Sequence, residues 1–169
     1  MSLDKELRVV PDFPKPGIEF LDISPLLEDA KLFQQLISSL AEKSQDWNFD
    51  KIVAIESRGF ILGSALAQAM GKGFVMVRKK GKLPGETVAN TYDLEYGTDT
   101  IEMLPTSIHK DEKVMILDDV LATGGTAAAT CELVEKLGGQ IVGCLFFIEL
   151  SFLKGREKLK FPTEALVIR

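Results

Sequence analysis

The chain has 169 residues, a formal net charge of −5 at pH 7 and 46% hydrophobic residues, which is typical of one globular domain covering residues 1–169. The acidic balance argues against broad binding to nucleic acids or to anionic membranes. The longest wholly apolar run, residues 144–148, is far shorter than the roughly 20 residues that span a bilayer. Because no signal peptide is evident at the start and the two cysteines have no metal-ligand spacing, we expect a cytoplasmic protein with reduced thiols.

Three prolines within residues 10–17 favour an extended, stiff leading segment over a helix. The pair Ser24-Pro25 then predicts a helix start, with Ser24 as N-cap and Pro25 at the first helical position. A longer helix is predicted from Asp29 to about Lys43, because apolar residues recur there at helical spacing.

Short apolar runs at residues 52–55, 74–77, 114–117 and 141–148 predict buried strands, with helices between them at 60–70 and 127–137. Gly71 and Gly73 are predicted to end the first of these helices, and residues 166–168 could add a closing edge strand. Strands that alternate with helices indicate an α/β fold, a mainly parallel twisted sheet flanked by helices. Ligands of such sheets bind beyond the carboxyl ends of the strands, so the polar segments after each strand should meet at one edge.

Two of these polar segments carry cations. Glu56-Ser57-Arg58-Gly59 follows one strand, and Arg78-Lys79-Lys80-Gly81-Lys82 gives four cations within five residues after another. The second segment opens a region, about 79–102, in which residues 87–92 and 100–103 could pair as an antiparallel excursion. A charged loop of this kind is usually a solvated surface. Its start at the ligand-binding edge favours a lid instead.

The most informative segment follows strand 114–117. Asp118 and Asp119 come first, and the run Ala122-Thr123-Gly124-Gly125-Thr126 then leads into an alanine-rich helix. A glycine-rich turn at a helix N-terminus binds anions, because backbone N–H groups converge and the helix dipole favours negative charge. Carboxylates would repel a phosphate but can accept hydrogen bonds from ribose hydroxyls. An ordinary turn with an acidic lip is the alternative, but the order of these features favours a phosphorylated sugar.

This stretch resembles the phosphoribosyl-pyrophosphate motif of the type I phosphoribosyltransferases. It lacks both the Gly-Lys-Ser/Thr ending of a P-loop and the G-x-G-x-x-G pattern. The resemblance extends to the adenine phosphoribosyltransferases through PDFPKPGIEFLDISPLL, ESRGF, RKKGKLPGETVANTYDLEYG and LKGREKL. It implies the type I phosphoribosyltransferase fold, with a small N-terminal hood at about residues 8–28, a flexible antiparallel lid at about 79–102, and a homodimer.

The resemblance also implies the reaction. Adenine and 5-phosphoribosyl 1-pyrophosphate would give AMP and pyrophosphate in purine salvage, with Mg²⁺ held mainly by the substrate pyrophosphate and water. Such a transfer develops positive charge on the ribose and negative charge on the leaving group, so cations at the pyrophosphate and exclusion of water are both needed. The cation-rich segments and the lid supply these features.

Individual residues receive roles from the same resemblance. Glu95 would be the general acid/base, and Tyr96 would help to close the lid. Phe20 would stack on adenine while the main chain of Glu19 and Leu21 reads its edge, although many members have Arg where this chain has Leu21. The remaining implied contacts are Leu121 and Leu150 on the base, Arg58, Arg78 and Lys82 on pyrophosphate, Asp118 and Asp119 on the ribose, and Ala122, Thr123, Gly124, Gly125 and Thr126 on the 5′-phosphate.

Two other functions remain open at this point. One is the same chemistry on another 6-substituted purine or on xanthine. The other is a regulator of the same fold that senses phosphoribosyl pyrophosphate and binds nucleic acid. Such a regulator should carry a basic face or an added DNA-binding segment. The chain has neither, and it keeps Glu95 and the lid cations, which favours an enzyme.

Overall fold

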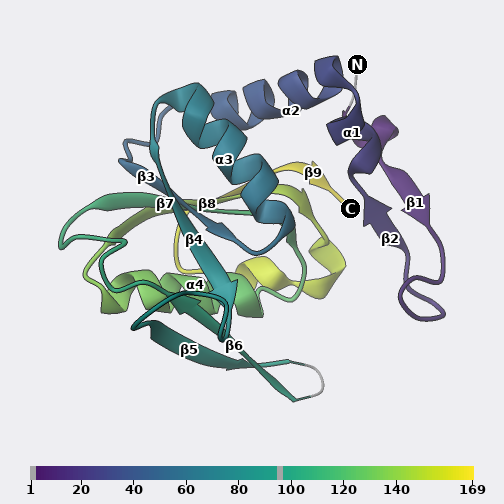
Figure 1. Cartoon of the computed structure of the whole chain (residues 1–169). Helices are drawn as coiled ribbons and strands as arrows, with labels where there is room; N and C mark the ends of the chain where they lie inside the picture. The colour runs from purple at the N-terminus through teal and green to yellow at the C-terminus, as the bar shows by residue number, and fades with distance from the viewer. Residues whose placement is uncertain (1–2, 95–96) are drawn as a thin grey trace. The chain divides into compact units, whose positions relative to one another are not determined.

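A computed structural model describes residues 3–94 and 97–169 (Figure 1). The chain divides into two compact units, Met1–Ser39 and Leu40–Arg169. Two of the predicted site residues, Glu95 and Tyr96, lie outside the described residues.

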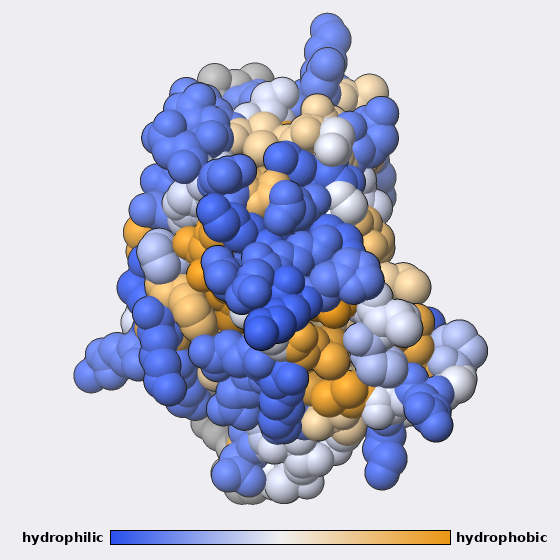
Figure 2. All heavy atoms as spheres, turned by 90° about the vertical axis from the view of Figure 1, so that its left-hand side faces the viewer, coloured by the Kyte–Doolittle hydropathy of each residue, from blue (hydrophilic) through white to orange (hydrophobic). Residues whose placement is uncertain are grey.

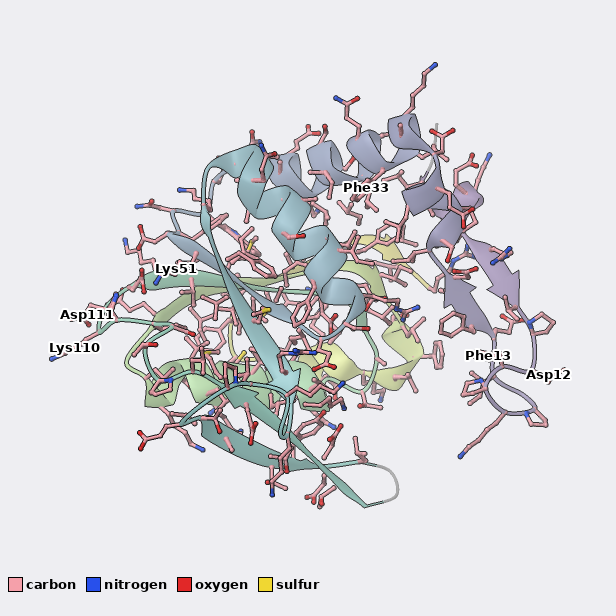
Figure 3. All side chains as sticks on the ribbon, viewed as in Figure 1. Asp12, Phe13, Phe33, Lys51, Lys110 and Asp111 are labelled. Atoms are coloured by element: carbon pink, nitrogen blue, oxygen red, sulfur yellow. The ribbon has the colours of Figure 1, made fainter. Side chains whose placement is uncertain are left out.

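The first unit contains a small antiparallel sheet. Strands β1 (Arg8–Val10) and β2 (Phe20–Asp22) pair so that Arg8 faces Asp22 and Val10 faces Phe20. The prediction of an extended segment between these strands is wrong, because residues 11–17 form turns. Asp12 Oδ1 accepts a 2.7 Å hydrogen bond from the Gly17 N–H across these turns. The rings of Phe13 and Phe20 meet edge to face with centroids 5.1 Å apart, and Phe13 is labelled in Figure 3.

The helices near the N-terminus depend on aspartate side chains. After a 3-10 helix at Leu3–Glu6, α1 covers Ser24–Glu28 and α2 covers Ala30–Lys43. Ser24 is not the N-cap that the sequence predicts. It is the first helical residue, and its N–H and hydroxyl both donate to Asp22 Oδ1, at 2.9 and 2.7 Å. Asp29 Oδ1 likewise accepts from the first N–H groups of α2, so this helix begins where expected.

The second unit is built on a seven-stranded sheet in the order β5-β6-β4-β3-β7-β8-β9. Its five central and C-terminal strands run parallel, and β5 and β6 are antiparallel, which confirms the mainly parallel sheet. The strands are β3 (Lys51–Ile55), β4 (Gly73–Lys79), β5 (Val88–Asp93), β6 (Thr98–Met103), β7 (Lys113–Leu121), β8 (Gln140–Glu149) and β9 (Thr163–Ile168).

The structure corrects two of the predicted element ends. Strand β7 does not end before the aspartates but continues through them to Leu121, because Val120 and Leu121 extend the ladder opposite Ile148 and Glu149. Gly73 does not end a helix but starts β4. Gly71 does end α3 as predicted, in the left-handed conformation at φ +64°.

Helices α3 (Arg58–Met70) and α4 (Gly125–Lys136) cover opposite faces of the sheet (Figure 1). The strand order explains this, because α3 leads from β3 to β4 in one direction and α4 leads from β7 to β8 in the other. Right-handed crossovers in opposite directions place their helices on opposite faces. The direction therefore reverses between β3 and β7, which makes this the switch point of the sheet.

The excursion at residues 79–102 is the antiparallel hairpin that the sequence predicts. Strands β5 and β6 pair from Val88–Met103 to Asp93–Thr98, and β6 also pairs with β4 at Arg78 and Lys79. The hairpin therefore starts from the sheet itself. At the other end of the chain, two 3-10 turns (Ser151–Leu153 and Gly155–Lys158) precede β9, which closes the sheet as an edge strand.

The amino ends of the strands carry a separate group of charged residues. Lys51 Nζ donates to the Ser107 carbonyl and to Glu112, both at 3.0 Å, and Lys110 and Asp111 lie on the same side (Figure 3). Figure 2 looks at this side and shows hydrophilic side chains over its centre. Within residues 3–94 and 97–169, no helix is long and apolar enough to cross a membrane.

Candidate functional site

The switch point brings two polar segments together. Strands β3 and β7 pair in parallel up to Ala54 and Leu117, so Glu56-Ser57-Arg58, which follow β3, lie next to Asp118-Asp119 near the carboxyl end of β7. Ligands of doubly wound sheets bind at such a point. The expectation that these segments converge on one edge is confirmed. The Glu56–Ser57 peptide is cis.

Arg58 and Asp119 form an ion pair between these two segments. Arg58 Nε lies 2.7 Å from Asp119 Oδ2, and the Asp119 side chain is buried. The adjacent carboxylate of Asp118 accepts a 2.8 Å hydrogen bond from the Asp119 N–H through Oδ1. One acid is therefore paired with a cation, and the other is held by the backbone.

Burial raises the pKa of both aspartates. For Asp118 the negative charge of Asp119 adds to burial, and its pKa lies well above the ordinary value. For Asp119 the raised pKa is opposed by the charge of Arg58. Two carboxylates this close are stabilised in the ionised form by a nearby cation or by hydrogen-bond donors, and ribose hydroxyls are such donors.

Gly59 in the first turn of α3 lies directly against Asp118. A Cβ on Gly59 would come within 2.7 Å of Asp118 Oδ1 and 3.3 Å of its Cα. The absence of a side chain at this position lets the start of α3 approach the end of β7. The close contact fixes Arg58, one residue earlier, beside the acidic pair.

The lid cations gather on one carboxylate, that of Glu56. Its Oε2 accepts a 2.8 Å hydrogen bond from the Lys79 N–H and lies 3.4 Å from Arg78 Nε, and its Oε1 pairs with Lys82. Burial opposes the ionisation of Glu56, but the hydrogen bonds from Lys82 and Lys79 and the charges of Lys82 and Arg78 together lower its pKa. Two predicted pyrophosphate cations are thus brought together by one anion.

The glycine-rich loop forms a small pocket at the N-terminus of α4. Gly124, at φ +78°, is the N-cap, and the helix begins at Gly125. The pocket has a volume of about 70 Å³ and is lined by Asp118, Val120 and the seven residues from Leu121 to Ala127. It combines the end of β7 with helix N–H groups, which is the arrangement that binds a phosphate.

The hairpin contacts this loop through Tyr92. The Thr126 hydroxyl donates to Tyr92 Oη at 3.0 Å, and Tyr92 donates in turn to Asp99 at 3.3 Å. A Cβ on Gly125 would lie 3.4 Å from the Tyr92 ring. Asn90, on the same strand, donates to the Ala129 carbonyl of α4 at 3.1 Å. The base of the lid is therefore fixed to the helix that follows the anion loop.

Other predicted residues fall into three groups. Leu121 is buried in the pocket wall, and its carbonyl accepts a 2.9 Å hydrogen bond from the Leu150 N–H, so these two are together. Glu19, Phe20 and Leu21 belong to the first unit, where Phe20 and Leu21 are half-buried in β2 and Glu19 precedes it exposed. Glu95 and Tyr96 are outside the described residues.

Sequence reasoning missed the organising residues of the site. Glu56 stands in the quoted ESRG segment, but no spacing indicates that it holds cations some 20 residues later in the chain. Tyr92 reads as an ordinary strand residue. Gly59 could have been noticed, because a glycine in the first turn of a helix after a strand often marks a close backbone approach.

Comparisons with known proteins show the family of this chain. The phosphoribosyl transferase domain family matches residues 24–164. Adenine phosphoribosyltransferase of Acetivibrio thermocellus is 53% identical over 169 residues, covering 99% of each chain. The crystal structure of the Thermoanaerobacter pseudethanolicus adenine phosphoribosyltransferase matches with a TM-score of 0.97 at 47% identity, over 99% of this chain and 98% of that one.

A third match comes from a structure with ligands. Adenine phosphoribosyltransferase of Saccharomyces cerevisiae, solved with an imino-altritol bisphosphate and adenine, matches with a TM-score of 0.92 at 46% identity. The alignment covers 97% of this chain and 96% of that one. The matches therefore extend over both units, including the segments that precede the sheet.

Proposed function

Because this chain belongs to the phosphoribosyl transferase family, we propose that the site at its switch point transfers a phosphoribosyl group from 5-phosphoribosyl 1-pyrophosphate to adenine, giving AMP and pyrophosphate. Relatives about half identical over nearly the whole chain are adenine phosphoribosyltransferases. The chain is accordingly a pentosyltransferase of purine salvage. The alternatives of a nucleic-acid-binding regulator and of another purine have no comparable support.

One observation carries the assignment of the site. The pocket at the N-terminus of α4 joins Asp118 to the Ala122–Thr126 loop in a single cavity. A site for ribose 5-phosphate needs groups that accept hydrogen bonds from the ribose hydroxyls next to groups that donate hydrogen bonds to the phosphate. This cavity offers both. The loop N–H groups receive the phosphate, and the aspartates accept hydrogen bonds from the sugar.

The cations act on the other end of the substrate. Arg58, Arg78 and Lys82 bind the pyrophosphate and stabilise the charge that it gains as the bond to the ribose breaks. Arg58 is suited to this role because a guanidinium can hold two phosphate oxygens at once. Glu56 holds Arg78 and Lys82 together in the free enzyme, and the pyrophosphate replaces Glu56 as their partner when the substrate binds.

The roles in adenine recognition follow from the resemblance to the adenine phosphoribosyltransferases. Phe20 stacks on the ring while the main chain of Glu19 and Leu21 reads its donor and acceptor edge. An oxo-purine reverses that pattern and leaves buried groups unpaired, at a cost of about 1–3 kcal/mol each. Glu95 serves as general acid/base at the imidazole edge, Tyr96 helps to close the lid, and Leu121 and Leu150 supply apolar walls.

Mg²⁺ enters this proposal as a partner of the substrate. Among residues 3–94 and 97–169, no group of three or more His, Cys, Asp or Glu side chains could hold a metal ion. Glu56 and Asp119 pair with Arg58, Arg78 and Lys82. We propose that Mg²⁺ binds mainly through the pyrophosphate oxygens of the substrate, which are ligands that it prefers.

Assembly and location complete the proposal. We propose a homodimer, since Ile61 of α3 and Met76 of β4 are exposed large apolar side chains of the second unit; sedimentation velocity would test it. We propose a cytoplasmic location, because Cys131 and Cys144 are free thiols with their Sγ atoms 3.9 Å apart and reducing compartments keep such pairs open.

A purine panel tests the function. AMP formation should be rapid from adenine with Mg²⁺ and phosphoribosyl pyrophosphate, while hypoxanthine, guanine and xanthine should react at least about 100-fold more slowly, as expected when two donor and acceptor groups are mismatched. Comparable turnover on hypoxanthine or guanine would overturn the adenine assignment. The panel also tests whether Leu21, in place of the Arg of many members, changes the preference for adenine.

A further inference from the structure

The LKGREKL segment, residues 153–159, contains no residue that the proposed reaction uses. It lies between β8 and β9 and forms the 3-10 turn Gly155–Lys158. Gly155 is buried, although its neighbours Lys154 and Arg156 are exposed. A buried glycine in an exposed turn indicates that its backbone touches something that a side chain would displace.

Gly155 touches the phosphate loop. A Cβ on Gly155 would lie 2.2 Å from the Ala122 carbonyl oxygen and 2.9 Å from the Gly124 nitrogen. Conversely, a Cβ on Gly124 would lie 2.3 Å from the Gly155 carbonyl oxygen. The atoms in the way belong to backbone, which cannot rotate aside as a long side chain can. Two glycines far apart in the chain thus permit one close backbone contact.

The turn that carries Gly155 is itself anchored. Arg156 Nε donates to Glu149 Oε1 at 3.0 Å, its Nη2 donates to Oε2 at 2.5 Å, and its Nη1 donates to the Thr163 carbonyl. Glu149 is buried at the end of β8, and Thr163 starts β9. A two-pronged ion pair of this kind fixes orientation as well as distance. The turn is therefore held by two strands of the sheet.

We propose that Gly155 is a positioning residue for the 5′-phosphate. The backbone of the anchored turn packs against Ala122 and Gly124. This contact keeps the N–H groups from Thr123 to Thr126 in the geometry that binds a phosphate monoester of ribose. Preorganised donors bind more tightly because no ordering cost is paid on binding. This inference rests on the proposed phosphate site in the Ala122–Thr126 loop.

Gly155→Ala tests the support directly. The added methyl group pushes on Ala122 and Gly124, so AMP and ribose 5-phosphate should bind about tenfold or more weakly by calorimetry, an effect of about 1.4 kcal/mol or more. Adenine and pyrophosphate, which do not use the loop, should keep their affinities within about threefold. Equal weakening of all four ligands would overturn the proposal.

Gly143→Ala is the matched control. A Cβ on Gly143 of β8 would come within 2.6 Å of the Trp47 ring, so this variant also introduces a buried clash, but with a side chain and away from the loop. This variant should lower the melting temperature and leave AMP affinity unchanged. If it weakens AMP binding as much as Gly155→Ala does, the effect is a general loss of stability and the proposal fails.

Two further variants cover the remaining outcomes. Arg156→Lys keeps the charge but loses the two-pronged contact to Glu149, so it should also weaken AMP more than adenine, even if Gly155→Ala does not fold. Thr123→Asp tests the phosphate site itself, because a carboxylate at this exposed position of the loop would repel a bound phosphate. If Thr123→Asp leaves AMP affinity unchanged, the phosphate site is misassigned. If Thr123→Asp weakens AMP binding but Gly155→Ala and Arg156→Lys do not, only the supporting role of Gly155 is wrong.

Discussion

Arg58 and Asp119 face each other across the switch point of the sheet, with 2.7 Å between Arg58 Nε and Asp119 Oδ2. The pair joins a residue assigned to pyrophosphate to one assigned to the ribose. A substrate that carries both groups must bind next to both partners. The ion pair therefore fixes how the two halves of the site are spaced, and Gly59 behind it allows the close approach.

Asp119→Asn should weaken phosphoribosyl-pyrophosphate binding by about 10- to 100-fold, because a hydrogen bond to a charged group contributes about 1.5–3 kcal/mol. Combined with Asp118→Asn, binding should become undetectable by titration calorimetry. The exposed Asp46→Asn serves as the control. Retention of binding in the double variant would remove the aspartates from ribose recognition.

Glu56→Gln should raise the KM for phosphoribosyl pyrophosphate about tenfold while the KM for adenine changes little. The amide still accepts a hydrogen bond from the Lys79 N–H, but it no longer attracts Arg78 and Lys82 through charge, and charged hydrogen bonds are about twice as strong as neutral ones. Steady-state kinetics with each substrate varied measures this. Glu86→Gln, an exposed acid of the same lid, is the control, and parallel changes in both KM values would contradict the role of Glu56.

The fold follows from sequence pattern to a large extent, and the particular elements show why. Buried strands with no polar residue, such as Ile52–Ile55, can be recognised from composition alone, and their alternation with helices predicts parallel pairing and a ligand edge. The end of β7 was missed because Asp118 and Asp119 look like a strand terminator. Ladder pairing with β8 holds them in the strand, and that pairing partner is remote in sequence.

The sequence indicates which residues form the site, but not which of them contact each other. The loop at Gly124 and the cations at Arg78 and Lys82 have local signatures. Glu56, Tyr92 and Gly155 act on partners 20 to 35 residues away, and no local pattern encodes such distances. The prediction for Ser24 is wrong for a different reason, because the nearby carboxylate of Asp22 accepts its hydrogen bonds and Ser24 becomes the first helical residue.

Tyr92→Phe should lower the free energy of unfolding by about 1–3 kcal/mol, because it removes two hydrogen bonds that usually contribute about 0.5–1.5 kcal/mol each. The ring still packs against Gly125, but the hydroxyl bridge from Thr126 to Asp99 is lost. Urea unfolding gives the energy. Hydrogen exchange should show faster exchange in Thr98–Met103 than in the wild type, whereas Glu86→Gln at an exposed position of the same lid should leave that exchange unchanged. No change in exchange for Tyr92→Phe would contradict a tether between lid and helix.

Asp22 should make the protein lose stability in acid. Hydrogen bonds from the Ser24 hydroxyl and N–H, helped by Arg8, lower its pKa from 3.8 to about 2. A carboxyl whose pKa is lower in the folded state stabilises that state while it is ionised, so its contribution is complete above about pH 4 and is lost as the pH falls toward about 2. Asp22→Asn should reduce the difference in melting temperature between pH 5 and pH 2.5, and Asp46→Asn should not. An unchanged difference in Asp22→Asn would contradict this role.

The position of the sugar phosphate is the centre of the account, and a crystal structure with bound AMP measures it most directly. The phosphate should lie against the N–H groups of residues 123–126, and the ribose hydroxyls should lie within hydrogen-bond distance of Asp118 or Asp119. A nucleotide whose phosphate occupies any other part of the chain would contradict the assignment of the loop and of every residue whose role depends on it.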